Sequence, residues 1–409
     1  MATLERCCGF ECGRSTPGTN ISGHWTLSGT ASFDTATKRS GDRSLRTNPT
    51  AGVGEGLLAK PGSAVSISRS YVNIASAPIA SGVVLGFAIA GSVMGGLAYK
   101  TTDGLWYAAF DDGITVTFGA TGVSISTGTW VKIDIKADAS ANPWLVAVSV
   151  DGVALGQASL ANVADTSSQM ICGAGSIRAV NTFDIYHDDF IESNTAEDYP
   201  LAAGQIFHYV PTSDGTHNTG TAGTFIRGSA GANITDATTD SYLLIDEVPL
   251  DDTTPDTNDY INQAVAGSTN YVENKFGPAP GITTPGAPDI VEVIYGFHQE
   301  GTGLGGCSFR LNDNGTESVL NTLTNVAGVT TTRYDRNDYQ LMVGGGAWTL
   351  ARFENLRFRF GYSGDANPDQ YLDCAMIEAH FPDAGNILAA IGFQIPVRTH
   401  PQPARMIGY

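Results

Sequence analysis

The chain has 409 residues, enough for two or three domains that each bury a core. It carries 41 Asp and Glu against 22 Lys and Arg, a formal net charge of −19. Binding to nucleic-acid phosphates needs clustered Lys and Arg, so we expect no nucleic-acid partner. No apolar run approaches the roughly 20 residues of a membrane helix, and the N-terminus lacks the layout of a secretory signal. We therefore expect synthesis in a cytoplasm, with no signal peptide and no membrane partner.

The composition favours short strands joined by turns. There are 49 Gly, only 15% of the residues are charged, and β-branched residues dominate the apolar stretches. Long runs of helix-forming residues at helical spacing are missing. The sequence therefore predicts an all-β fold.

The first expected unit covers residues 1–197. Strand-like stretches recur at the spacing of a β-sandwich, at residues 64–74, 82–89, 95–99, 105–110 and 114–118. A hairpin follows, with strands over residues 127–137 and 144–150 that alternate apolar and polar side chains and a turn at Asp151 and Gly152. The alternation predicts one buried face and one solvent face. The unit closes on a strand at residues 183–191.

A polar segment at residues 193–200 is expected to link this unit to a second one, over residues 198–385. The second unit has strand-like stretches at residues 205–210, 242–248, 271–276, 290–298, 307–311, 339–343, 356–362 and 371–381, with a turn or short helix at 348–353. Residues 386–409 are expected to form an extended C-terminal tail that lies on a partner, because residues 391–397 are too apolar for a free tail.

Several short motifs resemble those of known families. Gly-Thr-Trp-Val-Lys-Ile-Asp-Ile at 128–135, followed by Val-Asp-Gly-Val at 150–153, resembles the late hairpin of concanavalin A-like, laminin-G-type jelly rolls. Gly-Phe-Glu at 9–11 and Arg-Ser-Gly-Asp-Arg-Ser-Leu at 39–45 resemble the opening of such modules and of jelly-roll carbohydrate-binding modules. The resemblance implies two antiparallel jelly-roll β-sandwiches in tandem.

Over residues 7–385 the chain also resembles two-sandwich structural proteins of tailed-bacteriophage virions. This resemblance implies a non-enzymatic capsid decoration or tail-associated protein, located in the virion and bound to major capsid or tail proteins. We expect a homo-oligomer, a trimer rather than a dimer. The alternative is a carbohydrate-binding adhesin for host or environmental glycans, which exposed aromatic side chains in a concave pocket would favour.

The same resemblance implies a structural calcium ion held by Glu11 and Asp188, although no cofactor is expected to be required. Calcium takes about 6 to 8 oxygen ligands, so two carboxylates with carbonyls and water would suffice. The alternative is a carboxylate that caps a turn or faces water. Asp188 and Asp189 are neighbours on a strand, so their side chains are expected to point to opposite faces.

No catalytic constellation is apparent in the sequence. The seven histidines are scattered singly, and the nucleophile-elbow and phosphate-loop motifs are absent. We therefore expect that the chain is not an enzyme. Cys7, Cys8 and Cys12 lack the partners of a zinc site, while a disulfide within this cluster or to a neighbouring subunit stays open.

Overall fold

The computed structural model describes residues 3–11, 25–50, 52–89, 93–173, 181–220, 224–228, 231–246, 260–265, 267–278, 281–299, 306–313, 315–322, 333–365 and 370–383. The expected tail at 386–409 and Cys12 lie outside these residues, so both expectations stay predictions.

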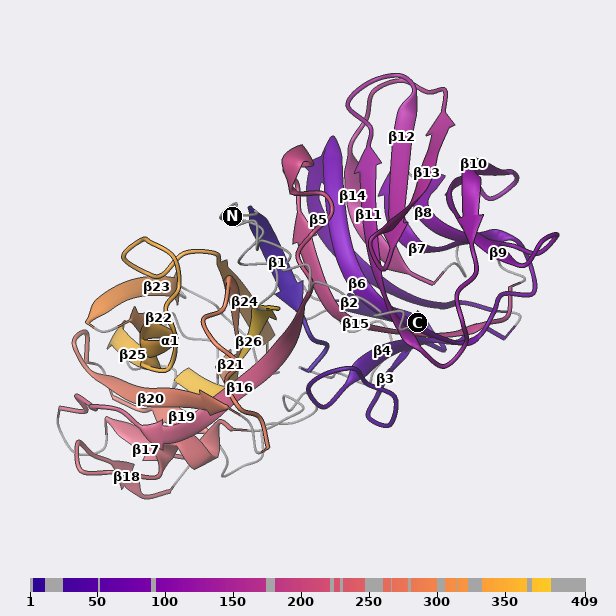
Figure 1. Cartoon of the computed structure of the whole chain (residues 1–409). Helices are drawn as coiled ribbons and strands as arrows, with labels where there is room; N and C mark the ends of the chain where they lie inside the picture. The colour runs from indigo at the N-terminus through magenta and orange to yellow at the C-terminus, as the bar shows by residue number, and fades with distance from the viewer. Residues whose placement is uncertain are drawn as a thin grey trace, which may run out of the picture.

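Two curled antiparallel sheets form the first unit (Figure 1). The larger sheet has eight strands, in the order β13 (Val153–Leu160), β12 (Trp144–Val150), β11 (Trp130–Asp138), β6 (Val65–Ser76), β15 (Asp184–Ser193), β4 (Ser44–Thr47) and β3 (Ser32–Asp34), with β1 (Leu4–Cys8) beside β15. The facing sheet has seven strands, in the order β10 (Val116–Val123), β9 (Leu105–Asp111), β8 (Val93–Lys100), β7 (Gly82–Ile89), β14 (Ser167–Cys172), β5 (Gly54–Ser63) and β2 (Trp25–Gly29).

Side-chain alternation explains the core between these two sheets. Ile133 pairs with Val150 and Ile135 pairs with Val148, and these side chains join one apolar cluster with residues of the facing sheet. Asp151 and Gly152 both have positive φ, at 48° and 81°, as a tight hairpin turn requires. The predicted hairpin is therefore confirmed.

The predicted solvent face of this hairpin is partly covered, which corrects the sequence-based expectation. Asp134 is fully buried, and Lys132 Nζ lies 3.1 Å from its carboxylate. Lys132 Nζ also donates to the carbonyl of Leu201 at 3.1 Å, and Lys136 Nζ donates to that of Ala196 at 3.4 Å. The segment that links the units, including the short 3₁₀ helix η1 (Ala196–Asp198), thus packs on this face.

One continuous antiparallel sheet of eleven described strands forms the second unit. Nine run in the order β18 (Asn233–Ile234), β17 (Phe225–Arg227), β19 (Ile261–Gln263), β26 (Gln370–Pro382), β16 (Gly204–Asp214), β20 (Tyr271–Pro278), β25 (Leu356–Asp365), β22 (Gly306–Asp313) and β23 (Thr316–Thr322). On its other side β26 pairs with β21 (Ile290–Gln299), which pairs with β24 (Arg333–Tyr339). The sheet surrounds its own aromatic-rich core.

The all-β antiparallel prediction is confirmed, while the tandem jelly-roll description and the boundary at 197 and 198 stay predictions. The predicted short helix is α1 (Leu350–Phe353). The strand predicted at 242–248 is wrong over its described residues, 242–246, and the strand predicted at 339–343 is wrong as well. A 3₁₀ helix, η2 (Ser241–Leu244), replaces the first because the Asp214 carboxylate accepts from the Ser241 and Tyr242 amides, at 3.0 and 2.9 Å.

The second misplaced strand is a turn, because β24 ends at Tyr339 and Met342 N donates to Gly346 O at 3.0 Å. No helix among the described residues is long and apolar enough to cross a membrane.

The two units share a buried junction. Strand β1 belongs to a sheet of the first unit but also contacts β21 and β26 of the second, and it lies between the units in Figure 1. An apolar cluster crosses the junction and contains Leu4, Cys7, Ile67, Ile191, Leu201, Ile206 and Ile290. The linking segment therefore connects two bodies that are packed together.

Candidate functional site

Glu11 lies at the junction, in the turn after β1. Its backbone is fixed by Glu378 of β26, whose carboxylate accepts from Gly9 N at 2.6 Å and from Glu11 N at 2.9 Å. The Glu11 side chain is fully buried. A residue of the second unit thus positions the carboxylate that the sequence analysis assigned to calcium.

Asp188 reaches the same neighbourhood from β15. One carboxylate oxygen accepts from Arg39 N at 2.7 Å and Ser40 N at 3.3 Å, and the other accepts from Asp189 N at 2.8 Å. Glu11 Oε2 accepts from Asp42 N, at 2.8 Å. Glu11 and Asp188 therefore hold one turn, residues 39–42, through its amides. Their proposed calcium stays a prediction.

The expectation that Asp188 and Asp189 point to opposite faces is wrong. The Asp189 carboxylate also reaches this turn, where it accepts from Arg39 Nη1 and from Ser40 Oγ. The pairing of β15 with β6 shifts register between Asp188 and Ile191, and Asp189 has a φ of 50°. This β-bulge breaks the alternation on which the expectation was based.

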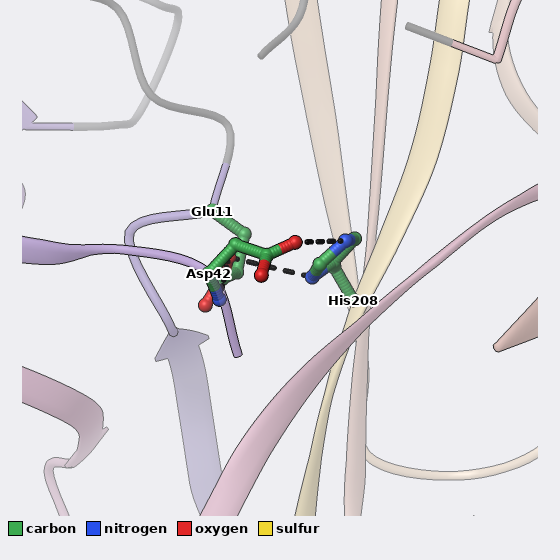
Figure 2. A group of neighbouring side chains, drawn as sticks. All are labelled: Glu11, Asp42 and His208. Atoms are coloured by element: carbon green, nitrogen blue, oxygen red, sulfur yellow. Dashed lines mark hydrogen bonds and ion pairs between the residues drawn. The ribbon is translucent and has the colours of Figure 1, made fainter. Parts of the chain in front are cut away.

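A second set of ligand-type side chains meets Glu11 at this turn: Asp42 and His208. Figure 2 shows the Glu11 and Asp42 carboxylates on the same side of the His208 ring, each facing a different ring nitrogen. His208 Nδ1 lies 3.3 Å from Glu11 Oε2, and His208 Nε2 lies 3.5 Å from Asp42 Oδ2. Glu11 and Asp42 come from the first unit, whereas His208 comes from β16 of the second, so the cluster bridges the junction.

The cluster is buried on one side and open on the other. His208 and Glu11 are at most 1% exposed, whereas the Asp42 side chain is 56% exposed. Burial raises the pKa of Glu11, opposed by the hydrogen bond and charge of His208. Among the described residues, Glu11 Oε1 has no hydrogen-bond partner. Gly41 leaves the necessary room, because a Cβ there would lie 1.8 Å from Glu11 Oε1.

Buried polar contacts extend along the junction from this cluster. Arg69 donates to Asp189 O at 2.7 Å and lies 2.9 Å from His380 Nε2, while His380 Nδ1 lies 2.6 Å from Asp289 Oδ1. Burial lowers the pKa of both Arg69 and His380. Burial, with the nearby Asp189 charge, raises the pKa of Asp188 well above its ordinary range. The junction is thus a network of ionisable groups that are buried away from solvent.

An open cleft of about 350 Å³ lies elsewhere, in the second unit. It is lined by Tyr209, Thr212, Ser213, Lys275, Phe276, Gly277, Pro278, Thr284, Phe353 and Glu354. These residues come mainly from β16 and β20, the end of α1 and the loop before β21. Neither the cleft nor the roles of Asp42 and His208 could be expected from the sequence, because no local pattern connects residues that meet only through sheet pairing.

The N-terminal cysteines show no metal site among the described residues. Cys7 and Cys8 are buried, and burial raises the pKa of Cys7 well above its ordinary value. A disulfide to Cys12 lies outside the described residues and stays open.

Comparison with known proteins gives only distant matches. No protein-family profile matches the chain, and no curated protein matches it. Similar solved structures include a protein titled "Sialidase", with 12% identity over 43% of this chain and 17% of that chain and a TM-score of 0.32. A Trypanosoma rangeli sialidase in complex with the inhibitor DANA has 14% identity over 43% and 29% and a TM-score of 0.30. The carbohydrate-binding module CBM66 from Bacillus subtilis has 12% identity over 42% and 98% and a TM-score of 0.29.

These neighbours correct one sequence-based expectation. The chain spans less than a third of the length of these sialidases, and TM-scores near 0.3 assign it no activity. Sialidases are nevertheless enzymes, so the prediction that this chain is not an enzyme is contradicted and we withdraw it. That prediction was based on the absence of local catalytic motifs in the sequence. Catalytic groups are recognised by their geometry, however, and can come from separate strands.

Proposed function

We propose that this β-sandwich protein binds carbohydrate in the cleft between β16, β20 and α1. The observation that carries the proposal is the cleft itself, in which hydroxyl groups and two opposite charges border the nearly buried rings of Tyr209, Phe276 and Phe353. Ligand sites of this kind use an apolar surface for contact area and a few polar groups for orientation. The structural similarity to the carbohydrate-binding module, with a TM-score of 0.29, is too low to support the proposal. The proposal therefore rests on the cleft.

The aromatic part of the cleft is rigid. Tyr209 packs edge-on against Phe353, with ring centroids 4.7 Å apart, and its hydroxyl donates to Thr284 Oγ1 at 3.1 Å. Burial and the nearby Glu354 carboxylate raise the pKa of Tyr209 to about 12, so its hydroxyl stays protonated at neutral pH. Tyr209 thus supplies a fixed polar group beside an apolar surface.

The rim of the cleft offers both donors and acceptors. Lys275 is half-buried, whereas Thr212 and Glu354 are exposed. An ammonium group donates, a carboxylate accepts and a hydroxyl does both, which suits the hydroxyls of a sugar. The net charge of −19 disfavours a polyanionic glycan, so we propose a neutral one.

The experiment is a screen of immobilised neutral and acidic glycans, followed by calorimetry with the best neutral binder. Hydrogen bonds to charged groups contribute about 1.5–3 kcal/mol, so Glu354→Gln and Lys275→Ala should each weaken binding about 10- to 100-fold. Glu197→Gln, at an exposed glutamate of the first unit, is the matched control and should bind like the wild type. Binding to no neutral glycan, or equal binding by all four proteins, would overturn the proposal.

A second proposal concerns the setting, and it rests on the sequence resemblance over residues 7–385. We propose a virion component that assembles on capsid or tail proteins as a homo-oligomer. The burial of the side chains supports this proposal. Among the described residues, the large apolar side chains that are exposed are all aliphatic, including Ile79, Ile114 and Val163, whereas many aromatic side chains are buried in the cores. Quantitative mass spectrometry of purified particles should find a fixed copy number per capsid or tail; its absence from particles would contradict the proposal.

A further inference from the structure

The cluster of Glu11, Asp42 and His208 has a composition that neither the cleft nor the predicted calcium pair explains. It combines one imidazole with two carboxylates, and their ligand atoms all lie within 4.8 Å of one another. Calcium takes oxygen ligands, whereas imidazole with carboxylate is a common donor set for zinc and related transition metals. The chemistry therefore favours a cation of the Zn²⁺ class.

A second observation comes from Glu11. Its Oε1 atom is buried and has no hydrogen-bond partner among the described residues, while buried His208 Nδ1 has only the 3.3 Å contact with Glu11 Oε2. Buried polar atoms are nearly always paired, because an unpaired one costs about 1–3 kcal/mol. Glu11 Oε1 belongs to the cluster, where a metal ion would satisfy it.

We propose that Glu11, Asp42 and His208 bind one divalent transition-metal ion that clamps the two units together. The two carboxylates face different nitrogens of His208, so the ion takes a single nitrogen and one carboxylate must turn toward it. Asp42 is the ligand that moves, because its side chain is exposed whereas Glu11 is held in the interior. The open side at Asp42 also gives the ion a way in. Three protein ligands leave a fourth position for water.

The clamp would act on the junction. Glu11 and Asp42 belong to the first unit and His208 to β16, which begins directly after the segment that links the units. Binding to the folded state alone raises its stability by mass action. Zinc should therefore raise the melting temperature of the full chain.

The test is calorimetry on the full chain after treatment with a chelator, with Zn²⁺ alone and then with Ca²⁺ alone. We expect one Zn²⁺ per chain and no Ca²⁺ at this cluster. Loss of groups that only orient metal ligands typically costs about 10- to 100-fold in affinity, so loss of the ligand in His208→Gln should cost more than about 100-fold. His298→Gln is the matched control, because His298 is also buried against a carboxylate, with Nδ1 2.7 Å from Asp373 Oδ1.

Thermal unfolding gives a second measurement if calorimetric heats are small. Zn²⁺ should raise the melting temperature of the wild type and of His298→Gln but not that of His208→Gln, whose fold is checked by circular dichroism. No binding of Zn²⁺, or Zn²⁺ binding that survives His208→Gln, would overturn the proposal. Binding of Ca²⁺ alone would also overturn it and would instead support the predicted pair of Glu11 and Asp188. Glycan binding at the distant cleft is a separate result and decides nothing here.

Discussion

The core of the first unit and the junction between the units are both buried, but they are made of different groups. Trp144, Ile133 and Val148 represent the core, where apolar side chains of two sheets interlock. Arg69 and Asp189 represent the junction, where fully buried polar groups pair with each other and with the backbone. Apolar burial is non-directional, so a core tolerates many arrangements, whereas a buried charge needs one particular partner. The first unit is therefore stabilised by the amount of apolar surface that it buries, whereas the junction is stabilised by particular pairs of polar groups.

Truncation of the core should have the largest effect. Trp144→Ala removes a fully buried indole from the first unit and should lower the free energy of unfolding by about 3–5 kcal/mol. Chemical denaturation followed by far-ultraviolet circular dichroism measures this. Val163→Ala, at a side chain that is 71% exposed, is the control and should stay within about 0.5 kcal/mol of the wild type. A loss below about 1 kcal/mol in Trp144→Ala would contradict the description of the core.

Removal of one junction charge should come next. Asp189 accepts from Ser40 Oγ at 2.5 Å and from Ile206 N at 2.6 Å, and it pairs with Arg39. Asp189→Ala leaves these buried donors unpaired and should cost about 3 kcal/mol in the same denaturation experiment. Asp189→Asn keeps the size and the tolerance of positive φ, so it should cost less. Equal stability of the alanine variant and the wild type would show that the network contributes nothing.

The sequence predicted the core far better than the junction. The hairpin at β11 and β12 could be predicted because a period of two residues and a turn dipeptide are local signals. Glu11 and Asp188 were expected to lie close together from resemblance alone, and both do contact the turn at 39–42. No local signal connects Glu11 with His208, which is 197 positions away along the chain, so the bridging cluster depends on tertiary packing.

Two errors have the same physical origin. Asp134 has the spacing of a solvent-facing residue, but the linking segment covers it. Asp189 has the spacing of a residue on the face opposite Asp188, but a bulge turns its side chain. Periodicity describes a regular strand in isolation, so it carries no information about a bulge in that strand or about what packs against it.

Acid should destabilise the first unit through His187. Burial lowers the pKa of His187 to about 3, below the value of about 6.5 expected in the unfolded chain. Between these values the unfolded state binds a proton that the folded state does not, so this contribution to stability is complete above pH 6.5 and is lost as the pH falls. The loss should be about 1.4 kcal/mol per pH unit.

The substitution His187→Gln removes this contribution of His187 to the pH dependence of stability. Denaturation midpoints of the variant and the wild type, measured from pH 7 to pH 5, should differ in slope, with the variant less sensitive to acid. Parallel curves would mean that His187 is protonated to the same extent in both states.

The smallest effect is expected at the exposed edge of the bridging cluster. Asp42 Oδ1 lies 3.3 Å from Lys38 Nζ, and both side chains are at least a third exposed. Such pairs contribute about 0–1 kcal/mol, so Asp42→Asn should change stability by less than about 0.5 kcal/mol in the presence of a chelator. The same variant should lose the stabilisation by Zn²⁺. A large loss in chelator would show that Asp42 has a structural role apart from the metal.

Hydrogen exchange on the intact chain tests the central claim, that the junction couples the two units, most directly. The slowest amides of β6 and β15 report on the first unit, and those of β16 and β26 report on the second. We expect both groups to open with the same free energy in the wild type and with separate, lower free energies in Asp189→Ala. Different opening free energies in the wild type, unchanged by Asp189→Ala, would contradict the claim and show two units that unfold independently.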